Sequence, residues 1–186
     1  MATRFPTRKW IRLMNLTQAK WRLANPADVP TIGRLSRKLL GVLGEEDIIF
    51  EERQRLCPEG CHVFSDGAEI GAYIVSHPWR RGQPPALNQS LSALPADADC
   101  WYIHDIAVDR PCRGSGTAAT IVNAVTQNAH QASFSTVALV AVADALAFWN
   151  RLGFRDAMTD DLRRTLNSYG AHACYMERPT AAGLNA

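Results

Sequence analysis

The chain has 186 residues, of which 47% are hydrophobic and 20% are charged, and its formal net charge is +2. This length suits one α/β domain with a substantial core, and so small a net charge argues against a protein that binds nucleic acid through a basic surface. The sequence contains no apolar run of about eighteen residues, so we expect no membrane partner either.

The N-terminal segment is basic. Residues 1–20 carry five Lys and Arg side chains, and no acidic residue precedes Asp28. This composition is compatible with an organellar targeting segment. The favoured interpretation is a disordered tail or an over-long gene start at residues 1–13, because the first strand-like stretch comes only after Met14. We expect one domain over residues 14–180 and a C-terminal tail at residues 181–186.

The first half of the chain predicts a strand, two helices and a hairpin. Glycines at 41 and 44 end the apolar spacing of the first helix, and Asp66-Gly67 is a hairpin turn signal. The expected elements are residues 21–24, 26–40, 45–56, 61–65 and 68–76.

A long connection follows at residues 78–99. Gly82, Pro84, Pro85 and Pro95 interrupt it. Loops of this length are commonly functional or disordered. Because Trp79 offers an apolar anchor, we predict an ordered flap.

Residues 101–129 combine a strand, a glycine-rich loop and a helix. Residues 101–109 are rich in β-branched and aromatic side chains, Arg110-Pro111 ends the strand, and apolar positions recur at helical spacing from Gly116. The start of a helix presents unpaired N–H groups and the positive end of the helix dipole. The sequence therefore predicts a site for a phosphate or pyrophosphate.

Spacing separates three kinds of phosphate loop. A Walker loop requires a lysine that is absent here. Residues 114–119 satisfy the dinucleotide pattern G-x-G-x-x-A, which stays open as a less favoured alternative. Four residues separate these glycines from the strand, and only about seventy residues follow, too few for the usual dinucleotide domain.

The third pattern, Arg113-x-x-Gly116-x-Ala118, resembles the acyl-CoA signature of the GCN5-related N-acetyltransferase (GNAT) family. Residues 144–154 are similar to the second signature of that family, a short helix ending in Gly-Phe, and they follow the apolar run 136–142 in the family order. His104 and Asp144-Ala145-Leu146 are closest in pattern to the arylalkylamine N-acetyltransferases. The likeness extends over about residues 19–179.

The resemblance implies an α/β (α+β) fold with a central mixed, mostly antiparallel sheet of six to seven strands and about four helices, splayed between the fourth and fifth strands. It also implies acetyl-CoA as the co-substrate and direct transfer of the acetyl group to a primary amine of a small molecule. A protein N-terminus or lysine is an alternative acceptor. A CoA-binding sensor or regulatory module with weak or no catalysis is the alternative function.

The resemblance further implies which residues hold acetyl-CoA. The strand contributes its backbone to the pantetheine arm, the loop contributes N–H groups to the pyrophosphate, and the second signature contributes an apolar wall. These residues are Ile106, Ala107, Val108, Arg113, Gly114, Ser115, Gly116, Thr117, Ala118, Phe148, Trp149 and Arg151.

Attack on a thioester requires a neutral amine, and because an alkylammonium has a pKa near 10, a base or a chain of waters that removes the proton is needed. Strand alternation places Tyr102, His104, Ile106 and Val108 on one face and turns Asp105 away. The family places its base on the face shared by Tyr102 and His104, which makes His104 the candidate base. The alternative is a buried histidine without a proton role.

The second signature departs from the family at one position. The family usually carries a tyrosine there that protonates the leaving thiolate, whereas Trp149 cannot donate a proton of that kind. Tyr169 or Tyr175 is expected to substitute, or CoA leaves as a thiolate.

The acceptor is expected near the flap. The candidate substrate-binding residues are Trp79, Asn88 and His77, with anchoring of the loop as the alternative role of Trp79.

The five cysteines lack the paired spacing of a metal site, so we expect no metal. No secretory signal is visible, which favours the cytoplasm. The expected partners are acetyl-CoA and the amine, and a homodimer is an option that the sequence leaves open.

Overall fold

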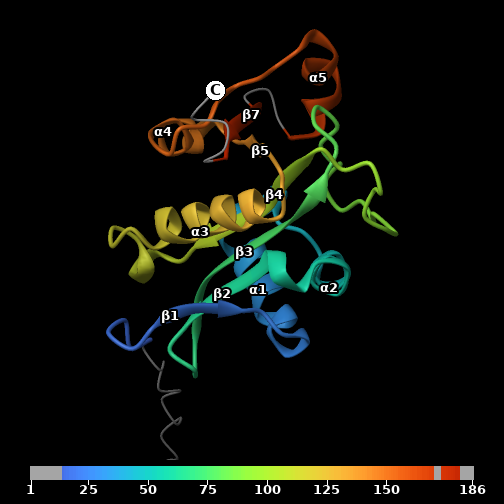
Figure 1. Cartoon of the computed structure of the whole chain (residues 1–186). Coiled ribbons are helices and arrows are strands. Elements are labelled where there is room, and N and C mark those ends of the chain that lie inside the picture. Colours follow the sequence, from blue (N-terminus) through green and yellow to red (C-terminus); the bar gives the residue numbers. More distant parts are fainter. Residues whose placement is uncertain (1–13, 170–172, 181–186) are drawn as a thin grey trace, which may run out of the picture.

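The computed structural model describes residues 14–169 and 173–180 (Figure 1). The tails predicted at residues 1–13 and 181–186 lie outside the described residues.

Within the described residues seven strands form one sheet in the order β1-β2-β3-β4-β5-β7-β6. In this part of the chain only β4 and β5 pair in parallel, and every other neighbouring pair of described strands is antiparallel. The predicted mixed, mostly antiparallel sheet is therefore confirmed. The strands are β1 (Lys20–Leu23), β2 (Cys61–Ser65), β3 (Ile70–Trp79), β4 (Cys100–Val108), β5 (Thr136–Ala141), β6 (Arg155–Asp156) and β7 (Cys174–Pro179).

The described chain also contains five α-helices, one more than the approximate number expected. They are α1 (Val29–Leu40), α2 (Asp47–Leu56), α3 (Thr117–Gln131), α4 (Leu146–Arg151) and α5 (Asp160–Thr165). Short 3₁₀ turns complete the structure at η1 (Pro26–Asp28), η2 (Gly41–Leu43), η3 (Pro58–Gly60), η4 (Arg110–Cys112), η5 (Ala143–Ala145) and η6 (Leu166–Tyr169).

Helix α5 is the element that the sequence analysis missed. Thr159 caps it, accepting a hydrogen bond from the Leu162 N–H group at 3.2 Å. Two aspartates occupy its first turn and two arginines its last, an arrangement that complements the helix dipole. This capping pattern was the available signal.

The helices cover both faces of the sheet. Helices α1 and α2 pack on one face through a buried cluster that includes Ile32, Phe50 and Tyr73. Helices α3 and α4 pack on the other face through a cluster that includes Val122 and Trp149. Figure 1 shows α1 and α2 beside β2 and β3, whereas α4 and α5 lie beside β5 and β7.

Strands β4 and β5 separate part-way along their length. Their pairing covers only three residue pairs and ends at Ile103↔Leu139. Beyond that point β4 continues to Val108 paired with β3 alone, and β5 continues paired with β7. The predicted splay is present, and it leaves one edge of β4 without a neighbouring strand.

A β-bulge in β4 corrects the predicted strand alternation. Val75 pairs with Asp105 and the next residue, Ser76, pairs with Ile103, so His104 is the extra residue. An extra residue reverses the alternation beyond it. Ala107 consequently packs with the α1 and α2 cluster, and Ile106 against the α3 and α4 cluster.

The prediction that Ile106 and Val108 share a face with His104 is therefore wrong, as is the prediction that Asp105 turns away. Strand alternation, which repeats every two residues, cannot show from the sequence that one extra residue is inserted in β4.

Candidate active site

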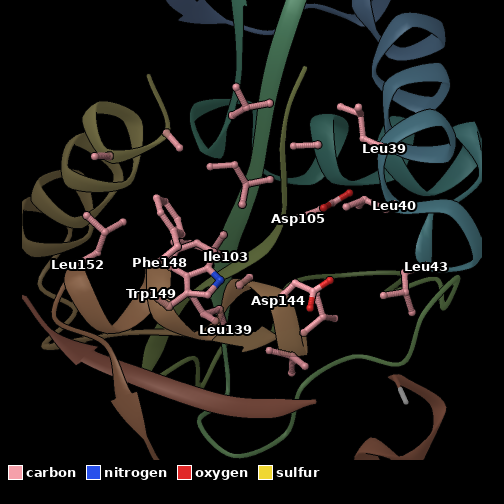
Figure 2. A pocket seen from close by; sticks show the side chains of 18 of the residues that line it. Leu39, Leu40, Leu43, Ile103, Asp105, Leu139, Asp144, Phe148, Trp149 and Leu152 are labelled. Carbon is pink, nitrogen blue, oxygen red and sulfur yellow. The ribbon is translucent and has the colours of Figure 1, made fainter. Parts of the chain in front are cut away.

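The splayed strands open into a cavity of about 680 Å³. One part, here called the donor half, is formed by the end of β4, the loop before α3, and α4. The other part, the acceptor half, is formed by α1, η2, the residues before α2, and the flap (residues 80–99). Figure 2 shows Phe148 and Trp149 beside Ile103 and Leu139, with Leu39, Leu40 and Leu43 across the cavity.

Nearly all residues predicted to hold acetyl-CoA line the donor half. Ser115 is the exception, and its hydroxyl is hydrogen-bonded to the Thr117 hydroxyl at 2.7 Å. The lining residues among them are Ile106, Ala107, Val108, Arg113, Gly114, Gly116, Thr117, Ala118, Phe148, Trp149 and Arg151.

The loop before α3 depends on two glycines. Gly114 and Gly116 have φ values of 84° and 79°, in the left-handed region. A Cβ atom at either position would meet no atom within 4 Å, so backbone conformation rather than space requires glycine here. Gly116 caps α3, whose first-turn N–H groups lack intrahelical acceptors. The loop and helix start thus offer main-chain donors suited to a pyrophosphate.

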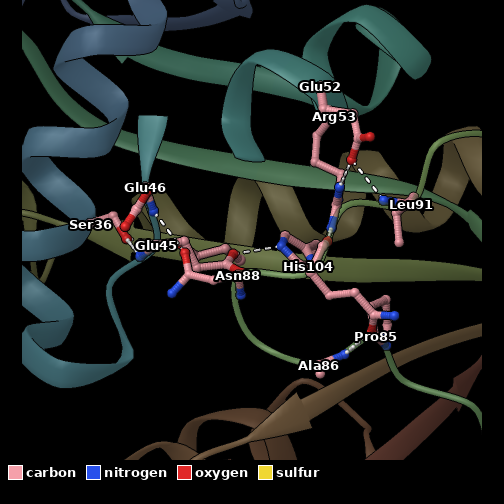
Figure 3. Close-up of polar contacts among 12 residues, drawn as sticks. Ser36, Glu45, Glu46, Glu52, Arg53, Pro85, Ala86, Asn88, Leu91 and His104 are labelled. Atoms are coloured by element: carbon pink, nitrogen blue, oxygen red, sulfur yellow. Dashed lines mark hydrogen bonds and ion pairs between the residues drawn. The ribbon is translucent and has the colours of Figure 1, made fainter. Parts of the chain in front are cut away.

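The acceptor half contains a buried acid–base pair, Glu45 and His104 (Figure 3). Their carboxylate Oε2 and ring Nε2 are 2.6 Å apart, and each side chain is 2% exposed. Burial disfavours the Glu45 carboxylate, but its contact with His104, the N–H group of Asn88 and the charge of Arg53 outweigh burial and lower the pKa of Glu45. Glu45 is therefore held as an anion beside His104.

Sequence reasoning missed Glu45. It lies 59 positions before His104, and no motif links the two residues. The sequence placed Glu45 only as the first residue of the helix predicted over residues 45–56.

Asp105 is a second carboxylate on the cavity wall, labelled in Figure 2. The Tyr73 hydroxyl donates to its Oδ2 at 2.6 Å, and the Ser36 hydroxyl lies 3.5 Å from the same oxygen. Burial raises the pKa of Asp105 to about 6, although Tyr73 and His104 act in the opposite direction. This carboxyl consequently titrates close to neutral pH.

A family model described as the acetyltransferase (GNAT) family matches residues 21–154. The chain belongs to this family. Its enzyme class is accordingly that of an acyltransferase, as the two sequence signatures predicted.

Solved structures share the GNAT fold at low sequence identity. GphF, a GNAT-like decarboxylase in complex with isobutyryl-CoA, is 12% identical with a TM-score of 0.73, covering 87% of this chain and 99% of that chain. The ribosomal-protein-S18-alanine N-acetyltransferase from Escherichia coli is 15% identical with a TM-score of 0.61, covering 87% and 94%. The N-acetyltransferase YhbS from Escherichia coli, in complex with CoA, is 19% identical with a TM-score of 0.58, covering 89% and 83%.

These likenesses establish the fold alone. No curated protein sequence matches the chain.

The GNAT domain places the two candidate tyrosines differently. Tyr169 lines the cavity, and its hydroxyl donates to the Pro85 carbonyl. Tyr175 lies outside the cavity wall, where its hydroxyl accepts from the Gly82 N–H group at 2.9 Å and donates to Glu177 at 3.1 Å. Of these two phenols, only Tyr169 reaches the site.

Trp149 is 5% exposed and packs against Phe154 at 5.1 Å between ring centroids. It thus contributes both to the core and to the cavity wall.

Four other predicted site residues do not line the cavity. Tyr102 is buried with its ring 6.3 Å from that of His104. His77 is also buried, its ring is 5.8 Å from His104, and burial together with His104 lowers its pKa to about 3. The Trp79 indole donates to the Gln83 carbonyl at 2.7 Å, which fits the anchoring alternative. Asn88 does not line the cavity but contacts Glu45.

The described ranges contain no helix long and apolar enough to cross a bilayer. No group of three or more His, Cys, Asp or Glu side chains within those ranges is placed to hold a metal ion.

Proposed function

We propose that the protein transfers an acetyl group from acetyl-CoA to the primary amine of a small molecule, by direct attack while both substrates are bound. The observation that carries this proposal is one continuous cavity that joins the glycine loop to the Glu45–His104 pair. A donor and an acceptor can therefore meet without a covalent enzyme intermediate.

The donor half fits acetyl-CoA. The unpaired edge of β4 leaves main-chain groups available to the pantetheine arm, and the start of α3 offers N–H groups to the pyrophosphate. Arg113 adds positive charge there, held by a 2.8 Å hydrogen bond from its Nε to the Val108 carbonyl. Arg151 on α4 lines the same half.

The acceptor half fits a cationic amine with an apolar body, aromatic or aliphatic. Leu39, Leu40, Leu43 and Leu87 provide an apolar wall. The carboxylates that line the cavity are Glu45, Asp105 and Asp144. Among the described residues, the Arg and Lys side chains on the cavity wall are Arg113 and Arg151, both on the donor half.

This distribution of charge favours an ammonium group and disfavours an acceptor that carries its own carboxylate.

The chemistry follows from these groups. The ammonium gives a proton to the Glu45–His104 pair, and the neutral nitrogen attacks the thioester carbonyl carbon. The amide bond forms, the C–S bond breaks with its electron pair leaving on sulfur, and the nitrogen loses its second proton, which replaces the proton that the thiolate takes up or passes to solvent. Tyr169 is the proposed proton donor to the thiolate, and departure as the free thiolate is the alternative.

Free thiol release on a panel of aryl-alkylamines, polyamines, amino acids and short peptides tests the proposal. Turnover is expected with amines that carry an apolar body, and weak turnover with amino acids. Turnover on peptides alone would move the acceptor to a protein N-terminus or lysine. CoA binding by calorimetry without turnover on any amine would favour the second candidate, a CoA-binding module, for which Trp149 at the usual tyrosine position is the supporting observation.

We also propose that the protein acts in the cytoplasm. All five cysteines are free thiols, which suits a reducing environment such as the cytoplasm.

A further inference from the structure

The flap forms part of the acceptor half through Leu87. It is held against α2 by hydrogen bonds to its main chain. The Arg53 Nη2 atom donates to the Gln89 carbonyl at 2.8 Å, and Glu52 accepts from the Leu91 N–H group at 2.8 Å. These hydrogen bonds dock the flap on α2.

Asn88, next to Leu87, makes a reciprocal contact with the residues before α2 (Figure 3). Its main-chain N–H group donates to Glu45 Oε1 at 2.7 Å, and its side-chain Oδ1 accepts from the Glu46 N–H group at 2.9 Å. Asn88 adopts φ 56°, in the left-handed region that asparagine tolerates better than most residues. The left-handed backbone of Asn88 thus directs its N–H group toward the Glu45 carboxylate.

One carboxylate therefore joins the flap to the proposed base. Glu45 binds the flap through Oε1 and His104 through Oε2. Its main-chain N–H group donates to the Ser36 hydroxyl at 3.1 Å, so its backbone is held as well. A displacement of Asn88 would be transmitted to His104 through a single side chain.

We propose that Asn88 is a positioning residue for the Glu45–His104 pair and that Leu87 sets the size of the acceptor, so that the flap couples acceptor fit to base orientation. This inference rests on the proposed acetyl transfer to an amine.

The flap has other anchors that do not involve Glu45. The Ser90 hydroxyl donates to Glu52, the Tyr169 hydroxyl donates to the Pro85 carbonyl, and Trp79 donates to the flap main chain. Attachment alone would therefore not require a contact with Glu45. Loss of the Asn88 side chain should leave the flap docked while it loosens Glu45.

Several titratable and charged groups surround Glu45 and bear on its titration. They are Tyr102, His104 and Asp105 of β4, Arg53 of α2, Tyr73 of β3 and Tyr169 of η6.

The test compares Asn88→Gly with Ser90→Ala in the full chain. Glycine keeps the left-handed backbone and the N–H donor but removes the contact to Glu46. Ser90→Ala removes another hydrogen bond of the flap, which goes to Glu52 and not to Glu45. For each protein the measurements are thermal midpoint, kcat and KM for both substrates against pH, and the Glu45 carboxyl titration followed by ¹³C NMR.

Asn88→Gly is expected to lower kcat about tenfold with an unchanged KM for acetyl-CoA, and to raise the pKa of Glu45 because the N–H contact weakens. Ser90→Ala should have the same kcat and the same Glu45 pKa as the wild type. Leu87→Ala should raise KM for short amines and improve kcat/KM for bulkier ones. Equal kcat in Asn88→Gly and Ser90→Ala, with an unmoved Glu45 titration, would overturn the proposal.

The NMR titration separates this inference from the proposed function, because it does not depend on turnover. If the wild type is inactive and Asn88→Gly still shifts the Glu45 titration relative to it, the coupling is supported and the proposed reaction is contradicted. If Asn88→Gly does not fold, Asn88→Asp replaces it. Aspartate keeps the acceptor for the Glu46 N–H group and adds a negative charge that should raise the pKa of Glu45, and an unmoved titration would again contradict the coupling.

Discussion

The donor and acceptor halves of the cavity are built from different kinds of atoms. The donor half offers mainly main-chain groups, namely the unpaired edge of β4, a loop with two left-handed glycines and the first turn of α3. The acceptor half offers side chains, including Glu45, His104 and Leu87. A site made of main-chain groups keeps its hydrogen-bonding groups after most substitutions that preserve the backbone. A site made of side chains changes its binding properties with each substitution. The acceptor half should thus determine which amine is used.

The largest effect is expected in the acceptor half. His104→Gln should lower kcat about 100-fold or more at neutral pH, because a positioned base contributes roughly 10² to 10⁴ in rate. The loss should shrink as pH rises, since free amine then forms without help. A pH series of thiol release measures it, and a loss that is the same at every pH would argue against a proton role.

Asp105 should produce a pH-dependent difference in stability. Its pKa is about 6 in the folded chain, above the usual value of 3.8, so the folded state binds this proton more tightly than the unfolded state. The contribution of Asp105 to stability is present below about pH 4 and is lost as pH rises through about 6, by on the order of 3 kcal/mol.

Asp105→Asn should therefore be more stable than the wild type above about pH 6. Denaturant unfolding of both proteins from pH 4.5 to 8 measures the difference. Free energies of unfolding that stay parallel across this range would show that Asp105 titrates normally.

The donor half should respond to backbone strain. Gly116→Ala places a side chain at φ 79°, which costs about 1–2 kcal/mol, although no atom stands in the way of the new Cβ. The Kd for acetyl-CoA is expected to rise about tenfold by calorimetry, with amine specificity unchanged. Ser115→Ala is the matched control, because Ser115 does not line the cavity. Equal Kd values in the two variants would contradict the role of the loop.

The smallest effect is expected for the leaving thiolate. A thiol pKa near 8.5 makes departure without a proton tolerable, so Tyr169→Phe should lower kcat only a few-fold. Tyr175→Phe should lower it less, because the Tyr175 hydroxyl faces Glu177 outside the cavity. A larger loss in Tyr175→Phe would reverse this assignment.

The donor half could be predicted from the residues because its determinants are local. Glycine positions, a strand break and a helix start lie within a short stretch of chain, and each acts on its own neighbours. The mixed, mostly antiparallel sheet and its splay between the fourth and fifth strands followed from the resemblance of two signatures to the family, whereas the strand order came from the structure.

The acceptor half could not be predicted because folding brings together side chains that are far apart in the chain. Glu45 and Asn88 lie 43 positions apart, and Glu45 and His104 lie 59 apart. The bulge at His104 reversed the face of Asp105, and one inserted residue leaves no trace in an alternating pattern. Local propensity thus predicts where an anion would bind, whereas long-range packing selects the groups that we propose act on the amine and its proton.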